Sequence, residues 1–540
     1  MLIPASLCDL PSDLSHRFGE RPAFGHLGES LSYVELDILS RRVAAWFQHN
    51  TDLQPGERIA LQLPNIMQYP VVLFGALRAG LIVVSTSPSY TPEELERHFT
   101  QSGARALVVY DAFAWKAARI LARTPIEYVI TTRIADLHPR WKRWPVNMKV
   151  RYRRGKTPAY RFHAGSTFKS VLELETGRFW EPPLFHAQDV ALLQYTGGTT
   201  GPAKGAMLTH ASLISNIHQL RTRLSEAGLE EGQRLFQPLP LYHGYSLTVV
   251  LLMMSLGSYV ELIPDPRNLR QLAKAFEKIN PTVIAGVNPL FVALSQHAEF
   301  TQLDFSSLRL TISGGMALTE STANRWHQVT GCVITEGYGL TECSPVVSVA
   351  EPGRMHPGSV GRPLPDTQVR IIGDNGEVLP TGETGRIQVK GPQLMAGYWD
   401  GMAIRSGLSG GWFATGDIGQ LDDRGELRVI EREQEVIHSA GFKVYPTELE
   451  NVISDHPGIL ECAVIGVPDE ELGESIKAYI VANNPRLTPR DVRDYCRERL
   501  TSYKVPRSVE FCRDLPRTSI GKVQRRRLRD QALSEMPKLR

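Results

Sequence analysis

The chain has 540 residues, of which 42% are hydrophobic and 22% are charged, and this composition excludes a disordered or fibrous chain. At roughly 150 residues per domain, it has room for three or four domains or subdomains. Its 60 Lys and Arg residues nearly balance 57 Asp and Glu residues, so the net charge of +3 excludes a strongly basic protein and predicts no nucleic-acid partner.

Cysteine usage and hydropathy indicate the compartment. The six cysteines form no CxxC pair, which argues against a zinc module and against a disulfide framework. The N-terminus has neither the basic start nor the apolar run of a signal peptide. The two most apolar stretches, 71–85 and 248–263, are interrupted by polar residues and are too short to span a bilayer. We therefore expect a cytoplasmic protein without a transmembrane segment.

Between residues 31 and 263, helical segments alternate with short β-rich runs such as RIALQLP, GLIVVSTS and RALVVYD. This alternation is typical of α/β layers around largely parallel sheets. Between these elements, residues 138–156 (HPRWKRWPVNMKVRYRRGK) interleave basic and aromatic side chains. Such a segment suits peripheral contact with an anionic membrane, because aromatic rings favour the interface and basic groups favour anionic lipids. A solvated surface excursion is the alternative interpretation.

The densest chemical signal is QYTGGTTGPAKG at residues 194–205, which lies between the strand-like runs VALLQY and AMLTH. Glycines let the backbone approach an anion closely, threonine hydroxyls donate hydrogen bonds, and a lysine adds positive charge, as polyphosphate binding requires. The lysine is not preceded by Gly and followed by Ser or Thr, so the spacing excludes a Walker A loop. The candidate phosphate-binding residues are Thr196, Gly197, Gly198, Thr199, Thr200, Gly201 and Lys204.

From about 363 to 430 the pattern changes to short strand-like runs separated by Asp, Asn and Gly turns, which predicts a small β-barrel-like subdomain. After Glu431 it changes again, to helices starting near Pro446 and after Thr488 with β-rich runs between and after them. The predicted class is α/β. We expect a large N-terminal domain (1–431), with two αβ layered subdomains and the β-rich one, and a small mobile α+β C-terminal domain (432–540).

Taken with four later motifs, the 194–205 loop resembles the phosphate-binding signature of adenylate-forming enzymes, the superfamily of acyl-CoA synthetases, luciferases and peptide-synthetase adenylation domains. The later motifs are GYGLTE (337–342), TGD (415–417), Glu431-Arg432 and PRTSIGK (516–522), in the family's order. The resemblance covers essentially the whole chain. It implies an enzyme that uses ATP and Mg²⁺ to activate a carboxylic acid.

The resemblance also implies a role for each motif residue. Lys522 and a magnesium ion offset the repulsion between an anionic carboxylate and an anionic phosphate, for which positive charge is needed in a desolvated site. Lys204, also a catalytic candidate, adds positive charge in the phosphate loop. Glu342 and Thr199 help to hold magnesium, which prefers hard oxygen ligands. The implied nucleotide contacts are Tyr338 stacked on adenine, Gly315 and Gly337 beside it, Thr341 at the α-phosphate, and Asp417 at the ribose with Arg432 next to it.

Several stretches, among them LPLYHGYSL, LDFSSLRLTISGGMAL and GFKVYPTELENVI, look most like bacterial long-chain fatty acyl-CoA synthetases. That likeness implies coenzyme A as the acyl acceptor and a fatty acid as the substrate. It places Tyr242 and His243 at the entrance for the acyl chain, and we count His243 among the catalytic candidates. Some long-chain members carry a tryptophan gate just after this histidine, whereas this chain has Gly244 and Tyr245.

The family works in two orientations of its C-terminal domain, and the resemblance therefore implies a hinge. The pivot position, where the family commonly has Asp or Lys, is Gln434 here. A neutral amide cannot form the ion pairs of a charged hinge, so we expect a weaker bias between the two orientations. In the second orientation, Gly441 and Lys443 are expected to border the pantetheine of coenzyme A.

The sequence leaves several alternatives open. A ligase for an aromatic or short-chain acid, or for another acceptor, has the same motifs. A membrane-peripheral binding module without turnover is a third hypothesis, opposed by the intact Lys204, Glu342, Asp417 and Lys522. We also keep a homodimer as an expectation. No motif encodes the preferred acyl chain length.

Overall fold

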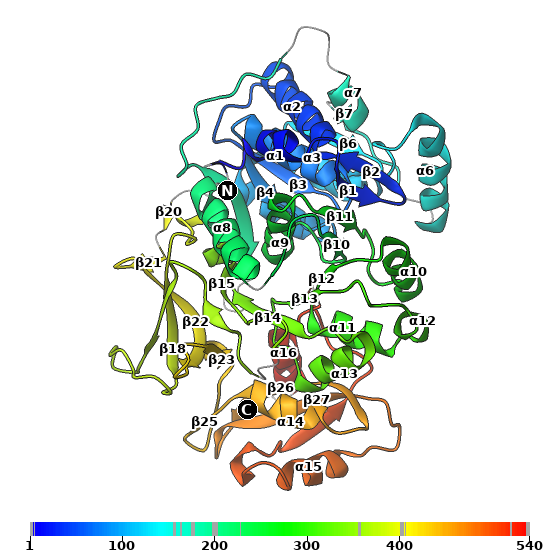
Figure 1. Ribbon diagram of the computed structural model, residues 1–540. Helices are drawn as coiled ribbons and strands as arrows, with labels where there is room; N and C mark the ends of the chain where they lie inside the picture. Colours follow the sequence, from blue (N-terminus) through cyan, green and yellow to red (C-terminus); the bar gives the residue numbers. More distant parts are fainter. Residues whose placement is uncertain are drawn as a thin grey trace.

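The computed structural model describes residues 4, 6–154, 158–162, 165–173, 179–196, 204–226, 228–354, 358–399, 404–405, 407–518 and 521–535. Two nine-stranded sheets form most of the N-terminal part, residues 4–431 (Figure 1). In the first sheet the central strands are parallel, and the antiparallel pairs lie at its two edges. Its order is β16 (Arg362–Pro363), β15 (Val346–Val349), β14 (Ile334–Gly339), β13 (Leu310–Ser313), β12 (Val283–Gly286), β10 (Arg234–Gln237), β11 (Tyr259–Leu262), β1 (Pro22–His26) and β2 (Glu29–Ser32).

The second sheet is parallel over its N-terminal strands and antiparallel where β8, β9, β19 and β20 pair. Its order is β20 (Ile404–Arg405), β19 (Gly397–Trp399), β9 (Lys204–Thr209), β8 (Val190–Thr196), β4 (Ile82–Ser85), β3 (Arg58–Gln62), β5 (Ala104–Tyr110), β6 (Tyr128–Thr132) and β7 (Gly165–Thr167). The three runs that predicted strands at the start of the chain are β3, β4 and β5. The predicted α/β layers are therefore confirmed.

Two apolar helices form the centre of this part. Every residue of α3 (Gln68–Arg78) is buried, and so is α9 (Gly244–Ser255) from Tyr245 onward. A helix that is apolar all round must be covered on all sides, and α2 (Tyr33–Asn50) and α8 (His210–Glu226) pack against them. Arg78, the one charge in α3, pairs with Asp37 at 2.5 Å and also donates to the backbone oxygen of Cys8. The buried guanidinium is thereby satisfied.

The remaining helices of the N-terminal part lie around the sheets. They are α1 (Leu10–Phe18), α4 (Pro92–Ser102), α5 (Ala114–Ile120), α6 (Arg140–Arg154), α7 (Phe168–Leu172), α10 (Leu269–Ile279), α11 (Asn288–Gln296), α12 (Ala298–Thr301) and α13 (Glu320–Thr330).

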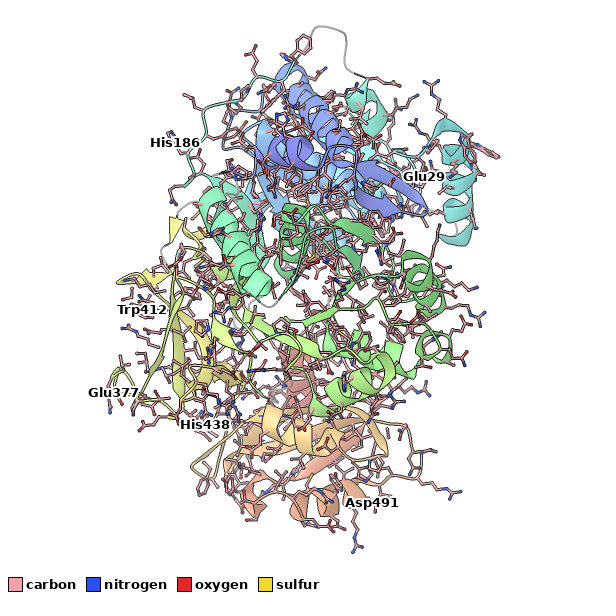
Figure 2. All side chains as sticks on the ribbon, viewed as in Figure 1. Glu29, His186, Glu377, Trp412, His438 and Asp491 are labelled. Carbon is pink, nitrogen blue, oxygen red and sulfur yellow. The ribbon has the colours of Figure 1, made fainter. Side chains whose placement is uncertain are left out.

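Helix α6 contains most of the basic and aromatic segment and lies at the outer edge of the molecule (Figure 1). Trp141 and Trp144 are 74% and 73% exposed, whereas Val146 packs against the core. Lys142 forms an ion pair with Glu29, which Figure 2 shows beside this helix. Among the residues that the structure describes, no helix is long and apolar enough to cross a bilayer.

The residues between 363 and 430 form a smaller antiparallel sheet. Three strand-like runs of this stretch, TQVRIIG, GRIQVKG and ELRVIER, are β17, β18 and β23. In this sheet β21 and β23 both pair with one edge of β22, and β18 pairs with the other edge. Strands β19 and β20, from the same stretch of chain, join the second large sheet through β9. The strands are β17 (Gln368–Ile372), β18 (Gly385–Lys390), β22 (Trp412–Leu421), β21 (Leu408–Ser409) and β23 (Leu427–Arg432).

The C-terminal part, described to residue 535, has its own sheet and its own core, and lies at one end of the molecule (Figure 1). The predicted helix starts are confirmed. Proline occupies the first turn at Pro446, and Thr488 closes a capping box with Asp491. The elements are β24 (Ile437–Ser439), β25 (Phe442–Val444), α14 (Pro446–Ser454), β26 (Ile459–Asp469), β27 (Gly473–Ala482), α15 (Pro489–Arg497), β28 (Ser508–Phe511) and α16 (Arg525–Glu535).

Candidate active site

Two adjoining cavities lie where the large sheets, the small sheet and the C-terminal part meet. The larger has a volume of about 1210 Å³ and the smaller about 870 Å³. Most of the predicted site residues line one or both of them. The walls that the two cavities share are Gly315, Gly337, Tyr338, Gly339, Arg432, Glu435, Arg517 and Lys522.

The predicted phosphate loop connects two antiparallel strands, β8 and β9, and Thr196 pairs in register with Lys204 at its base. Both residues line the larger cavity. Lys204 is exposed, and its Nζ lies 5.3 Å from the ring centroid of Tyr398. The loop itself, with Gly197, Gly198, Thr199, Thr200 and Gly201, lies outside the described residues.

Glu342 lies in a short 3-10 turn after β14 and is buried at the wall of the larger cavity. The Tyr398 hydroxyl donates a hydrogen bond to its Oε1 at 2.7 Å. Burial and the neighbouring carboxylate raise the pKa of Tyr398, so the phenol stays protonated and remains a donor. Because β19 pairs with β9, the side chain of Tyr398 lies beside both the Glu342 carboxylate and the Lys204 ammonium. These groups form one corner of the larger cavity.

This corner fits a magnesium ion. Within the described ranges there is no cluster of three or more acidic, histidine or cysteine ligands. Magnesium needs none, because it is commonly bound by one or two carboxylates together with substrate phosphates and water. Glu342 is the buried carboxylate that faces the strand ends flanking the phosphate loop. The predicted partner Thr199 belongs to the undescribed loop.

At the smaller cavity three motif residues make direct contact. The Tyr338 hydroxyl donates to Oδ2 of Asp417 at 2.5 Å, and Nε of Arg432 lies 2.8 Å from Oδ1. Asp417 and Arg432 face each other across the β22–β23 pair, which explains how motifs 15 residues apart meet. Burial raises the pKa of Asp417, and the positive charge of Arg432 opposes that rise. The cluster offers a carboxylate that can accept hydrogen bonds.

Glycine is required at two places along this wall. Gly315, just after β13, has a φ of +81°, a conformation that side chains strongly disfavour. A Cβ on Gly339 would lie 2.0 Å from the backbone oxygen of Pro345. Thr341 follows in the same wall of the larger cavity, and Gly337 faces both cavities. The strand ends therefore leave bare backbone next to Tyr338.

Lys522 comes from the C-terminal part and reaches both cavities. It stands in a tight turn, where its N–H donates to the Thr518 hydroxyl at 3.1 Å and Arg517 donates to the backbone oxygen of Gly521 at 2.9 Å. Burial, helped by the charge of Arg432, lowers the pKa of Lys522. Burial and the charge of Lys522 in turn lower the pKa of His243 to about 4, so the imidazole is neutral near pH 7.

Apolar side chains line a part of the larger cavity, which we call its apolar end. Tyr245 closes one wall by donating to the backbone oxygen of Ile312 at 3.1 Å. The remaining side chains come from α8, α9 and β15, so this end could not be predicted from any contiguous motif. They are Leu220, Leu224, Val249, Leu252, Val346 and Val349.

Two predicted cofactor contacts lie elsewhere. Gly441 lies in the turn between β24 and β25 and Lys443 lies in β25, and both are outside the walls of the two cavities. Lys443 instead forms an ion pair with Asp374 in the N-terminal part, at 3.2 Å. The structure therefore separates these two residues from Lys522, in the orientation that it shows.

Sequence reasoning missed Tyr398 and Glu336. Nothing in the local sequence marks Tyr398, because its role depends on β19 pairing with β9. Glu336 directly precedes the GYGLTE motif, lines the smaller cavity, and has its pKa raised to about 7 by burial. A carboxylate next to a nucleotide motif was a signal that could have been used.

Comparisons with known proteins agree with this geometry. The "AMP-binding enzyme" family matches residues 13–399, and the "AMP-binding enzyme C-terminal domain" matches residues 448–522. A curated long-chain-fatty-acid--CoA ligase from Haemophilus influenzae is 42% identical over 539 residues, covering 99% of this chain and 96% of that protein.

Solved structures show the same fold. The anthranilate CoA ligase AuaEII, in complex with anthranoyl-AMP, has a TM-score of 0.85 at 24% identity, with 98% of each chain covered. ATP-bound MatB from Rhodopseudomonas palustris is 28% identical, with a TM-score of 0.82 over 97% of this chain and 98% of that one. Apo MatB has a TM-score of 0.72 over the same shares of the two chains.

Proposed function

The chain belongs to the AMP-binding enzyme family, and on that premise we propose that it joins a medium- to long-chain fatty acid to coenzyme A, forming AMP and pyrophosphate from ATP. The observation that carries this proposal is a pair of adjoining cavities that share Lys522 and Arg432 in their walls. Lys204 and the buried Glu342 line the larger cavity together with apolar side chains, and Asp417 lines the smaller one.

In the first half-reaction, a carboxylate oxygen of the fatty acid attacks the α-phosphorus of ATP, and the bond to the β-phosphate oxygen breaks. The products are an acyl-adenylate and pyrophosphate. The two reactants are anions, so the site must supply fixed positive charge where negative charge develops. Lys522 does so from the C-terminal part, and Lys204 does so at the base of the phosphate loop.

The nucleotide is held by residues that the sequence already singled out. Asp417 accepts hydrogen bonds from the ribose hydroxyls, and Arg432 keeps its carboxylate oriented. Tyr338 presents its ring to adenine beside the bare backbone of Gly315 and Gly337. Thr341, Thr196 and the loop residues Gly197, Gly198, Thr199, Thr200 and Gly201 donate to phosphate oxygens. Glu342, with Thr199, would hold a magnesium ion, which would supply positive charge to the phosphates.

In the second half-reaction, the thiol sulfur of coenzyme A attacks the acyl carbonyl carbon, and AMP leaves as the bond to its phosphate oxygen breaks. No protein nucleophile is required, because the thiol supplies it. His243 is neutral near pH 7 and lines the same cavity as Lys522, so it borders the path of the acyl carbonyl without adding a second positive charge.

Two orientations separate these steps. We take residues 1–431 and 432–540 as the two domains, with Gln434 as the pivot. We assign the orientation in the structure to the first half-reaction, because Lys522 lines both cavities. Rotation frees Lys443 from Asp374 and brings Gly441 and Lys443 to coenzyme A.

Formation of AMP, measured with and without coenzyme A across acids from short to long chain, tests this function. We expect turnover that depends on coenzyme A and peaks at medium to long chains. A peak at aromatic or short-chain acids would show that the substrate is not a fatty acid of medium to long chain. Adenylation without turnover on addition of coenzyme A would show that another molecule accepts the acyl group. Failure to form any adenylate would favour a binding module without turnover.

We further propose a cytoplasmic location with peripheral contact to anionic membrane through residues 138–156. Helix α6 exposes two tryptophans among basic residues, and each basic group near an anionic leaflet contributes about 1 kcal/mol. Co-sedimentation with anionic vesicles should fall when Arg140 and Lys149 are changed to Glu. Matched reversals of Arg490 and Arg497 on the exposed face of α15 should not change it.

Equal co-sedimentation of the α6 variant and the wild-type protein would reject the membrane contact.

We also propose that the protein forms a homodimer. The molar mass in sedimentation equilibrium tests this, and the mass of a monomer would reject it.

A further inference from the structure

Arg525, the first residue of α16, stands three positions after Lys522 and faces three carboxylates. Two of its nitrogens lie 3.0 and 2.6 Å from the oxygens of Glu450, and a third forms a close ion pair with Glu435. Glu431 is 3.7 Å away. We call Arg525, Glu431, Glu435 and Glu450 the Arg525 cluster.

The three acids come from different elements. Glu450 lies on α14 in the C-terminal part, Glu435 in the turn that follows β23, and Glu431 in β23 itself. The other oxygen of Glu431 accepts the N–H of Thr447 at 2.8 Å. The guanidinium therefore connects the segment that carries Lys522 to the last strand of the N-terminal part, across the proposed pivot.

Among the described residues, the cluster is more buried than two ion pairs that join the N-terminal part to residues after Arg432. The side chain of Glu431 is 3% exposed and that of Arg525 is 17% exposed. In the Lys443–Asp374 pair, the lysine side chain is half exposed and the aspartate side chain is mostly exposed. The side chains of Arg386 and Glu433, whose charged atoms are 3.9 Å apart, are both well exposed. Exposed pairs contribute little, whereas removing one partner of a buried pair leaves an uncompensated charge.

The shape of the lysine turn does not depend on this link. Arg517 holds the other side of the turn through Gly521 and an ion pair with Glu461, both within the C-terminal part. What the Arg525–Glu431 contact determines is the location of the turn relative to β23, which carries Arg432 at the cavity wall. A rotation about the pivot at residue 434 moves Arg525 and Thr447 away from Glu431.

We propose that Arg525 is a positioning residue for the first half-reaction: it holds the Lys522 turn against Glu431, and this contact opens before the thioester step. The inference rests on the proposed function. It predicts a defect confined to one half-reaction, which a merely structural role would not produce.

The test compares Arg525→Gln with Arg529→Gln on the same helix. Arg529 is bonded to Glu474 at 2.6 Å, within the C-terminal part. Pyrophosphate release from ATP and fatty acid should fall about 10-fold or more in Arg525→Gln, because a buried pair is broken. Thioester formation from supplied acyl-adenylate and coenzyme A should stay within about twofold, and Arg529→Gln should leave both rates within about twofold.

Equal losses in both half-reactions, or no loss in either, would overturn the inference. If Arg525→Gln does not fold, Glu431→Gln decides the question, because it keeps an oxygen for Thr447 and removes the charge that faces Arg525. A selective loss of pyrophosphate release in that variant supports the inference, and an equal loss or none rejects it. Wild-type protein that forms no adenylate with any acid would instead refute the proposed function itself.

Discussion

The walls of the cavity and the turn that carries Lys522 are built in different ways. The walls rest on two nine-stranded sheets and on helices that are buried all round, and Tyr338, Asp417 and Arg432 project from paired strands. The lysine turn comes from a separate core and is held across the pivot by backbone contact and ion pairs.

This difference suits a reaction in two steps. Apolar burial fixes the walls, because moving them would expose core surface at about 25 cal/mol per Å². Ion pairs can exchange partners without exposing apolar surface, so the turn can leave and return. The account therefore assigns binding to the walls and the choice between half-reactions to the C-terminal part.

The largest expected effect is that of removing the lysine. Lys522→Ala should lower pyrophosphate release by roughly 10² to 10³, the usual cost of losing one transition-state donor. The matched control is Lys443→Ala, which removes a lysine outside both cavities. Little loss of pyrophosphate release in Lys522→Ala, or an equal loss in the control, would contradict the separate roles of the cavity walls and of the turn that carries Lys522.

The next effect concerns the walls. Asp417→Asn removes the charge that binds Arg432 and that we assign to the ribose, and charged hydrogen bonds contribute roughly 1.5–3 kcal/mol. We expect KM for ATP to rise about 10- to 100-fold while the preference among acids stays unchanged. Steady-state kinetics with ATP varied measures this. A change in acid preference instead would place Asp417 at the wrong end of the cavity.

A smaller effect is expected at the apolar end of the larger cavity. Val249→Phe narrows the apolar end, and each methylene that can no longer be buried costs about 0.8 kcal/mol. The chain-length optimum should therefore move to shorter acids, with KM for ATP unchanged. Val346→Ala on the facing strand should move it the other way. A chain-length profile that does not respond to either variant would exclude this end as the acyl site.

The smallest effect is expected at the pivot. Gln434→Lys adds a charge beside the Arg525 cluster, and partly exposed charges change free energies by about 1 kcal/mol or less. We expect the two half-reaction rates to change by a few-fold and in opposite directions. If both rates stay unchanged, the side chain at the pivot does not bias the orientations.

Much of the fold and the nucleotide end could be predicted from the sequence because their signals are local. The strand runs of the α/β layers are contiguous, and so are the motifs that contain Tyr338, Asp417 and Lys522. The pairing of β19 could not be predicted, since its partner strand β9 lies almost 200 residues earlier in the chain.

The same limit applies to the contacts that orient the site. Tyr398 reaches Glu342 only because of that long-range pairing, and Arg525 reaches Glu431 only because α16 folds back to β23. The apolar end gathers side chains from three separated elements. Pairing and packing of distant segments decide these contacts, and no spacing along the chain records them.

The most direct test of the account is the thioester step of Lys522→Ala in a single turnover, with acyl-adenylate and coenzyme A supplied. If the C-terminal part delivers this lysine for the first half-reaction alone, the variant forms thioester at the wild-type rate while its pyrophosphate release remains severely impaired. If thioester formation falls as far as adenylation, Lys522 is part of one undivided site, and the proposed division between walls and turn is wrong.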